Sequence, residues 1–435
     1  MELLNRKKTG KVERPVKVLQ FGEGNFLRAF VDYMIDIANE QGKFNGDIVL
    51  VKPIEFGSLD RFHDQECQYT VQLRGIVDGE PKRINRIVTS VADAVDAYGE
   101  YQKYADYAKL DSLRYIVSNT TEAGIVYDDT DRLEMEPPKS YPGKLTKFLY
   151  ERYKHFNGAM DKGLVMLPVE LIDDNGIHLK ECVEKLAVLW NLEDGFKTWL
   201  DEACVFTSTL VDRIVTGYPR DEAEELCKEF GYQDNLIVTG EPFALWVIES
   251  AKDISKEFPL PDAGLPVIFT DNQKPYKQRK VRILNGAHTS FVLASYLCGN
   301  DIVLESMQDE LIFNFMKATI FDEVIPTLTL PKQDLIDFAE AVITRFNNPY
   351  VKHALLSISL NSVSKWRARC MPSFLEYIKN EGKLPTHLTF SLAALMAFYT
   401  GTEIRDKALI GHRDGTEYQL SLIHISEPTR PISIS

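Results

Sequence analysis

The chain has 435 residues, is 44% hydrophobic and 26% charged, and carries a formal net charge of −14. Such a chain is globular and large enough for two or three domains, and the lack of a dense Lys/Arg stripe argues against a nucleic-acid groove. No apolar run reaches the ~20 residues of a membrane span, which argues against a membrane-spanning protein.

The first predicted elements are a strand, a glycine turn and a helix. Val16–Phe21 is a short apolar run that ends at Gly22-Glu23-Gly24, and residues 25–38 follow with helical periodicity. This order of elements is the context in which a loop cradles the pyrophosphate of a dinucleotide. Gly22 would allow the tight turn, and Gly24 would let the backbone approach a phosphate.

Two features complete this predicted cofactor loop. Leu27 stands where the usual fingerprint has a third glycine, and Arg28 could contact a phosphate instead. The candidate cofactor-binding residues of the loop are Gly22, Gly24, Asn25, Phe26 and Arg28.

The next two predicted strands bear on which dinucleotide is bound. Residues 48–51 end in Lys52-Pro53, so the acidic residue expected to bind the adenosine ribose of NAD is missing, and Lys52 could favour the 2′-phosphate of NADP. Residues 114–117 form a later strand, after which Ser118, Asn119 and Thr120 would face the cofactor crevice. An equal alternative is that these three polar residues merely cap the following segment.

Further along, the pattern changes from mixed to helical. Short Val/Ile-rich runs alternate with helical stretches up to about residue 270, which predicts a Rossmann-type, doubly wound α/β domain with a mainly parallel sheet over residues 1–270. Helical periodicity then dominates, as in residues 304–320, 332–346 and 388–399. We therefore expect a mostly helical catalytic and substrate domain over residues 271–419.

Lys280, Asn285 and His288 are the candidate catalytic residues, because reducing a ketone requires a proton donor and groups that neutralise the developing oxygen charge. In an α-helix Asn285 and His288 lie one turn apart, and Lys280 lies about two turns before His288 and about 80° round from it. If only the spacing of these residues is considered, a structural explanation is more frequent than a catalytic one. In that explanation Lys280 is exposed to solvent and His288 is a hydrogen-bonded residue of the core.

Several motifs occur in one order along nearly the whole chain. They are Gly22-Glu23-Gly24-Asn25-Phe26-Leu27-Arg28-Ala29, Ser118-Asn119-Thr120-Thr121-Glu122, Val211-Asp212-Arg213-Ile214, Lys280 with Asn285 and His288, and Arg345-Phe346-Asn347-Asn348-Pro349-Tyr350. In this order they resemble the polyol-specific long-chain dehydrogenases, the mannitol dehydrogenase family.

The resemblance implies an NAD-dependent, metal-independent reductase. In it Lys280 would be the general acid/base, and Asn285 and His288 would hold the substrate carbonyl and hydroxyl. Members with the most similar motifs reduce the keto-sugar acid tagaturonate to altronate in hexuronate breakdown. The alternatives are reduction of fructuronate, or of a neutral ketose as in mannitol-type enzymes.

One departure from the resemblance concerns the carbonyl oxygen. Where mannitol-type relatives have Cys-Asp-Asn, this chain has Val169-Glu170-Leu171, so the asparagine that assists their oxyanion corresponds to Leu171. Asn175 is a candidate to compensate.

Other ligands follow from composition and charge. The eight histidines show no H-x-x-x-H or H-E-x-x-H pairing, so we expect no metal. The six cysteines lack C-x-x-C spacing, which favours free thiols in the cytoplasm.

The carboxylate of a sugar acid suits arginine. Arg345, Lys352 and His353 are the candidate substrate-binding residues, within a basic cluster that also contains Lys365 and Arg367 and is expected to be mostly solvated. Oligomeric state is not predictable.

The last residues, 420–435, read differently from the rest. Leu420-Ser421-Leu422-Ile423-His424-Ile425-Ser426-Glu427-Pro428-Thr429-Arg430 looks like the translation of a sequencing adapter, and the resemblance to the family stops near Gln419. We therefore expect a non-native tail after a shortened C-terminus. A hypothesis of a different class follows from it, namely that the product is a non-catalytic fragment.

Overall fold

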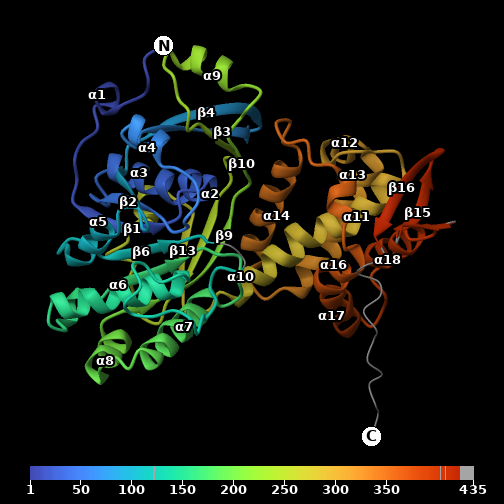
Figure 1. Ribbon diagram of the computed structural model, residues 1–435. Coiled ribbons are helices and arrows are strands. Elements are labelled where there is room, and N and C mark those ends of the chain that lie inside the picture. The colour runs from blue at the N-terminus through green and yellow to red at the C-terminus, as the bar shows by residue number, and fades with distance from the viewer. Residues whose placement is uncertain (121–122, 402, 407, 422–435) are drawn as a thin grey trace, which may run out of the picture. The chain divides into compact units, whose positions relative to one another are not determined.

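The computed structural model describes residues 1–120, 123–401, 403–406 and 408–421 (Figure 1). The chain forms two compact units. The first comprises Met1–Arg74 and Lys82–Gln273, and the second comprises Gly75–Pro81 and Lys274–Ser435. Of the tail expected over residues 420–435, Leu420 and Ser421 end a strand, and residues 422–435 lie outside the described residues.

A six-stranded parallel sheet forms the centre of the first unit, in the order β5-β2-β1-β6-β7-β8. Its strands are β1 (Val16–Phe21), β2 (Asp47–Lys52), β5 (Val91–Asp96), β6 (Tyr115–Ser118), β7 (Val165–Pro168) and β8 (Val205–Phe206). This is the strand order of a Rossmann fold, so the predicted fold class is confirmed. Because the order reverses between β1 and β6, a ligand crevice is expected at the carboxyl ends of these strands.

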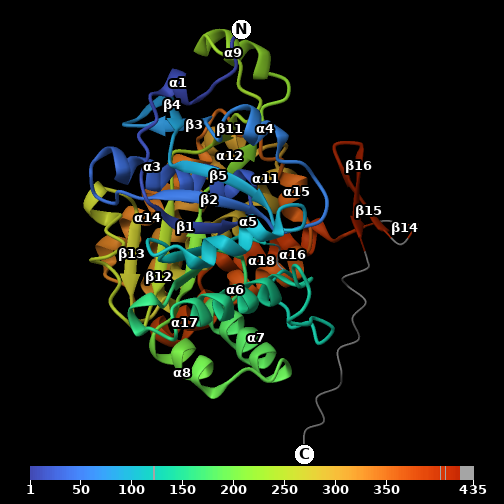
Figure 2. The same cartoon turned by 60° about the vertical axis from the view of Figure 1, so that its left-hand side comes forward.

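Both faces of this sheet are buried, because successive strand residues enter two different hydrophobic cores. Val18 packs into the core that contains α3, and its neighbour Leu19 packs into the core that contains α5 to α8 (Figure 2). Covered faces explain why the strands read as continuous apolar runs. The helices of this unit are α1 (Arg6–Thr9), α2 (Asn25–Leu27), α3 (Tyr33–Glu40), α4 (Asp60–Asp64), α5 (Tyr101–Asp106), α6 (Tyr141–His155), α7 (Asn175–Leu189), α8 (Asp194–Glu202) and α9 (Ala223–Phe230).

Two smaller sheets, which were not predicted, lie in the first unit except for Gly75–Pro81, the tip of the β3–β4 pair, which belongs to the second unit. One has four strands in the order β10-β11-β3-β4, and the other has three in the order β13-β12-β9. Their strands are β3 (Tyr69–Val77), β4 (Glu80–Val88), β9 (Ser208–Asp212), β10 (Val215–Gly217), β11 (Val238–Gly240), β12 (Leu245–Glu249) and β13 (Val267–Thr270). Trp246 of β12 is fully buried in the same core as α3, so the three-stranded sheet extends that layer.

Three buried arginines fasten loops of the first unit through backbone carbonyls. Arg152 donates to the oxygens of Lys162, Ala108, Leu110 and Leu113 at 2.7–3.0 Å. Burial lowers the pKa of its guanidinium to about 10, which leaves it charged near neutral pH. Arg28 and Arg213 are buried in a similar way and also donate to backbone carbonyls.

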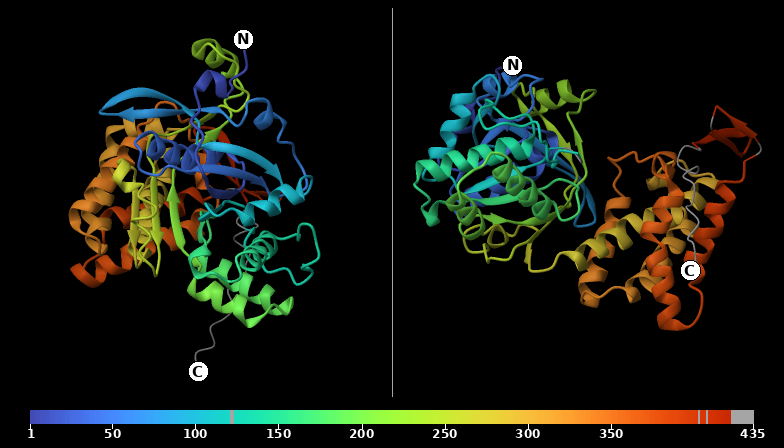
Figure 3. Two further views of the ribbon diagram at one scale, coloured as in Figure 1. Left: turned by 90° about the vertical axis from the view of Figure 1, so that its left-hand side faces the viewer. Right: turned by 60° about the horizontal axis from the view of Figure 1, so that its bottom comes forward.

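The second unit is mostly helical, as predicted. Its helices are α10 (Lys274–Arg279), α11 (Gly286–Leu297), α12 (Val303–Gln308), α13 (Glu310–Ala318), α14 (Lys332–Phe346), α15 (Leu355–Ser359), α16 (Ser362–Arg369), α17 (Met371–Glu381) and α18 (Thr386–Phe398). A small antiparallel sheet follows these helices, made of β14 (Glu403–Arg405), β15 (Ala408–Arg413) and β16 (Thr416–Ser421) (Figure 3, right). Across the described part of the chain, no helix combines the length and apolar character needed to span a membrane.

The helix predicted over residues 304–320 is interrupted in the structure. Asp309 leaves the helical conformation, and its carboxylate accepts the backbone N–H groups of Leu311 and Ile312 at 3.0 and 3.3 Å. An N-cap of this kind satisfies the free donors at a helix start. The single predicted helix is therefore two helices, α12 and α13.

Candidate active site

The glycine turn after β1 adopts the geometry that its sequence predicted. Gly22 has a φ of 124°, and its N–H donates to the carbonyl of Val51 at 2.9 Å. A Cβ at Gly22 would lie 3.1 Å from Leu27 and 3.2 Å from the backbone oxygen of Asn119, whereas a Cβ at Gly24 would have nothing within 4 Å. The protein itself therefore requires glycine at 22, and any requirement at 24 comes from a ligand.

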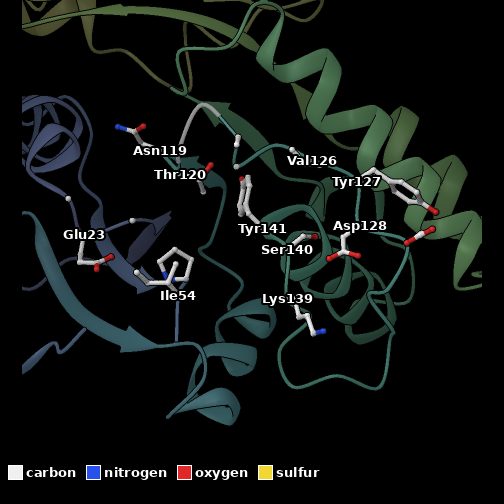
Figure 4. A pocket seen from close by; sticks show the side chains of 16 residues that line it. Glu23, Ile54, Asn119, Thr120, Val126, Tyr127, Asp128, Lys139, Ser140 and Tyr141 are labelled. Carbon is white, nitrogen blue, oxygen red and sulfur yellow. The ribbon is translucent and has the colours of Figure 1, made fainter. Parts of the chain in front are cut away.

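A cavity of about 790 Å³ opens beside this turn, at the carboxyl ends of β1, β2 and β6 (Figure 4). Its walls include Glu23, Gly24, Ile54, Asn119, Thr120 and Tyr141. The volume is within the range of small-molecule and cofactor sites, and the position is the one where a doubly wound sheet binds its ligand. The loop before α6, which supplies the far wall, carried no signal in the sequence analysis.

Arg28 lies inside the protein below the turn. It is 6% exposed, and its guanidinium donates to Leu236 O at 2.6 Å and to Asn25 Oδ1 at 2.7 Å. It also lies over the rings of Phe62 and Tyr69. The exposed Asn25 is held in place by this bond, while Phe26 stacks on Phe30. A direct contact between Arg28 and a phosphate stays a prediction. The hydrogen bond that Arg28 donates to Asn25 Oδ1 positions the Asn25 side chain.

Lys52, at the end of β2, is bound to the protein itself. Its side chain is 2% exposed and its Nζ lies 3.1 Å from Asp96 Oδ2. The same ammonium donates to the backbone oxygens of Ile54 and Glu55 at 2.9 and 3.3 Å. These bonds hold the chain that forms one wall of the cavity.

Ser118 and Thr120 converge on a carboxylate that the sequence analysis did not select. Glu170 is 2% exposed and accepts from Ser118 Oγ at 3.2 Å and from the N–H and Oγ1 of Thr120 at 3.1 Å. Burial raises the pKa of Glu170, and these hydrogen bonds partly oppose the shift. Glu170 thus orders the segment that follows β6, where Asn119 and Thr120 line the cavity.

Asn175 cannot take the place of the asparagine that Leu171 replaces. Its amide nitrogen donates to the carbonyls of Pro168, Glu170 and Thr209, and its oxygen accepts from two backbone N–H groups. Every hydrogen-bonding direction of this buried amide is therefore in use. Leu171 itself is 68% exposed.

In the second unit, Lys280 to Asn285 form one π-helical turn between α10 and α11. The expected α-helical phase, with Lys280 about 80° from His288, is therefore wrong. In a π turn the hydrogen bond joins residues five apart, so Lys280 lies one turn from Asn285 on a shared face. Asn285 and His288 are one α-helical turn apart at the start of α11. The π turn brings all three candidate catalytic residues to one side of the helix.

His288 is enclosed by aromatic rings and by basic groups. Its ring stacks on Phe346 at 4.2 Å and meets His353 edge-on at 5.4 Å. Burial lowers the pKa of His288 well below its usual value, and the nearby basic side chains of His353, Arg345, Arg369 and Lys365 lower it further. The imidazole is therefore neutral near physiological pH. Its Nε2 is buried without a hydrogen-bond partner in the described structure.

The structure gathers some of the predicted substrate-binding residues and adds one. Arg345 and His353 lie near His288. Lys352 is exposed on the segment between α14 and α15. Arg369 completes the group around His288 and had not been selected. Its spacing of four from Lys365 was a usable signal, since both residues fall on one face of a helix.

Residues 16–261 match the profile described as the mannitol dehydrogenase Rossmann domain, and residues 272–420 match the mannitol dehydrogenase C-terminal domain. The chain belongs to the mannitol dehydrogenase family. It is therefore an oxidoreductase, and its first unit is a Rossmann dinucleotide-binding domain.

Relatives within the family are similar over most of this chain. An altronate oxidoreductase of Yersinia enterocolitica is 46% identical over 421 residues, which cover 97% of this chain and 85% of that protein. One from Bacteroides thetaiotaomicron is 44% identical, covering 96% and 87% respectively.

Two solved structures show the same fold. A D-sorbitol dehydrogenase in substrate-free form matches with a TM-score of 0.79 at 21% identity, covering 96% of this chain and 88% of its own. The Pseudomonas fluorescens mannitol 2-dehydrogenase, in a ternary complex with NAD and D-mannitol, matches with a TM-score of 0.68 at 22% identity, covering 97% and 87%.

Proposed function

We propose that this protein catalyses the NAD-dependent interconversion of D-tagaturonate and D-altronate. The similarity to altronate oxidoreductases over more than nine tenths of the chain supports this reaction. The observation that carries the substrate class is the basic surrounding of His288, because Arg345, Lys365 and Arg369 suit an anionic sugar acid better than a neutral ketose. In this proposal the first unit binds the cofactor and the second binds the substrate.

NAD rather than NADP fits the residues at the end of β2. Recognition of a 2′-phosphate needs an available cation there, but Lys52 is bound by Asp96 and by backbone carbonyls. Glu23 also lines the cavity on this side, beside Ile54 in Figure 4. A carboxylate at this wall accepts a hydrogen bond from a ribose hydroxyl and repels a phosphate.

The chemistry at the keto carbon follows from three side chains of the second unit. Bound NADH would supply the hydride. Lys280 would donate a proton to the carbonyl oxygen, and the Asn285 amide would donate a hydrogen bond to the same oxygen as charge develops on it. His288, kept neutral by its surroundings, would use Nε2 to hold a substrate hydroxyl. In the described part of the chain, no cluster of His, Cys, Asp or Glu could hold a metal ion.

The two glycines of the turn give a test of the cofactor site. Gly22→Ala should lower stability by about 1–3 kcal/mol, because alanine is strained at its positive φ. Gly24→Ala should leave the melting temperature unchanged yet weaken NADH binding about tenfold or more, because its methyl would occupy the position that a pyrophosphate approaches. Thermal melting and fluorescence titration with NADH measure both effects. Unchanged NADH affinity in Gly24→Ala would show that the glycine loop is not part of the NADH-binding site.

The proposed reaction is tested by following NADH oxidation with tagaturonate, fructuronate and fructose in parallel, and with NADPH in place of NADH. We expect the largest kcat/KM for tagaturonate with NADH. A preference for fructuronate would still agree with a sugar acid bound by the basic side chains around His288. The substrate would then be fructuronate instead of tagaturonate. A preference for fructose would contradict the proposal, since a neutral ketose has no use for the basic group around His288.

A further inference from the structure

We propose that Lys365 and Arg369 of α16 bind the carboxylate of the substrate and select sugar acids over neutral ketoses. The proposal rests on the reaction proposed above and names residues for its substrate selectivity. Lys365 and Arg369 are four residues apart, so they project from the same face of the helix. Both are partly buried, whereas Arg367 between them is exposed.

The first argument is the missing countercharge. Lys365 donates to the backbone oxygen of Ile358 at 2.9 Å, and Arg369 donates to Thr289 Oγ1 at 3.4 Å. Neither side chain has a carboxylate within ion-pair distance among the described residues. Burial lowers the pKa of both groups, and Arg369 lowers that of Lys365 further.

The two cations lie four residues apart in a chain of 64 acidic and 50 basic residues. Other partly buried cations are held by a carboxylate, as Arg413 is by Asp301 at 2.7 Å, or by a backbone carbonyl, as Arg282 is by Thr327 at 3.3 Å. Lys365 and Arg369 differ from these in placing two like charges on one helix face. Like charges four apart destabilise a helix, and desolvating them adds to that cost. A structure that keeps two such cations together is suited to an anion from outside the protein.

The second argument is where these cations lie. Arg369 donates to Thr289, which follows His288 directly on α11, and the charges of Arg369 and Lys365 both lower the pKa of His288. The buried Nε2 of His288 has no partner in the described structure, so a hydrogen-bonding group is needed there as well. A sugar acid offers both features in one molecule, a hydroxyl for the imidazole and a carboxylate for the cations.

Guanidinium geometry indicates how the acid would be held. Arg369 uses one N–H group for Thr289, and its other donors can form parallel bonds to the two oxygens of a carboxylate. Lys365 would add a point charge to the same anion. A ketose phosphate presents related oxygens, so the test includes one.

The test compares Arg369→Met and Lys365→Met with Arg367→Met, a matched control on the exposed side of the same helix. We expect kcat/KM for tagaturonate to fall about 10- to 100-fold in each of the first two variants, mainly through KM, because each loses a charge-assisted bond. The KM for NADH should not change. Arg367→Met should stay within about twofold of the wild type, since an exposed cation contributes little.

Discrimination between substrates decides the proposal. The ratio of kcat/KM for tagaturonate to that for fructose should fall in Arg369→Met, and Arg369→Lys should recover part of it. If the wild type reduces tagaturonate and the variants keep its KM, the assignment of Lys365 and Arg369 is wrong while the proposed reaction stands. If the wild type prefers fructose, the reaction itself fails. If it prefers a ketose phosphate, the cations serve a phosphate and the carboxylate assignment is overturned.

Should Arg369→Met not fold, Lys365→Met and Arg369→Lys still decide the outcome. Folding is followed by circular dichroism, and an intact cofactor site by the KM for NADH.

Discussion

Replacing Lys280 with alanine should lower the rate of NADH-dependent tagaturonate reduction by about 10²- to 10⁴-fold, which is the usual contribution of a general acid. The π turn places Lys280 one turn from Asn285, so its ammonium can reach the same oxygen as the amide. The cofactor loop belongs to the other unit, so NADH affinity should be unchanged. Single-turnover kinetics and NADH titration measure the two effects separately.

A matched control for this variant is Lys332→Ala, which removes an exposed lysine at the start of α14. It should have the activity of the wild type. Full activity in Lys280→Ala would show that the proton comes from another group. Lost NADH binding in the same variant would show instead that the substitution acts through the fold.

Replacing Asp32 with asparagine should stabilise the protein at alkaline pH. Asp32 is fully buried below the glycine turn and accepts a hydrogen bond from Tyr69 at 2.6 Å. Burial raises the pKa of its carboxyl from 3.8 to about 7, against the opposing effects of Tyr69, Gln20 and Arg28. Its other oxygen has no hydrogen-bond partner in the described structure, nor has the amide oxygen of Gln20. An asparagine NH₂ can supply the donor that such acceptors lack.

The direction of the pH effect follows from proton binding. Between about pH 4 and about pH 7 the folded protein holds the Asp32 proton and the unfolded chain does not, so stability from this group is full below that window and falls across it. At about 1.4 kcal/mol for each pKa unit, the difference amounts to roughly 4 kcal/mol above pH 7. Asp32→Asn should therefore gain in melting temperature relative to the wild type as pH rises, and the gain should level off above about pH 7.

Asp36→Asn is the control, one helical turn along from Asp32. Asp36 accepts from Arg86 at 2.6 Å and from the N–H and Oγ1 of Thr89 at 2.7 and 2.9 Å, so losing its charge should destabilise the protein. A gain in Asp32→Asn that is the same at every pH would contradict protonation as its cause.

The central sheet was predictable because buried parallel strands and their helices leave strong local patterns. Val16–Phe21 and the α14 range Lys332–Phe346 have the predicted bounds. The strands β9 to β13 of the small sheets were not predictable, because each has only three to five residues and pairs with a strand outside its local sequence. Val238–Gly240, for example, pairs in parallel with a strand that begins at Tyr69. Such pairing depends on tertiary contacts that no local window contains. The nine-residue strands β3 and β4 were missed as well.

The candidate site was predictable in its residue types and less so in its geometry. A helical wheel assumes 100° per residue, so the π turn at Lys280 changes the phase of this candidate catalytic lysine without any change in composition. Glu170 looked like a departure from the family pattern, and its role became visible only once β6 and β7 lay side by side. Arg367 was selected by sequence proximity, whereas the helical face selects Arg369.

The buried arginines imply that ionic strength acts differently on the fold and on substrate capture. Arg152, Arg28 and Arg213 donate to neutral backbone carbonyls, and buried bonds of this kind are little affected by dissolved salt. A sugar acid approaching the cations on α16 crosses solvent, where ions screen the attraction within about 10 Å at moderate salt. Raising the salt concentration should thus leave the architecture intact while lowering the rate at which a sugar acid is captured.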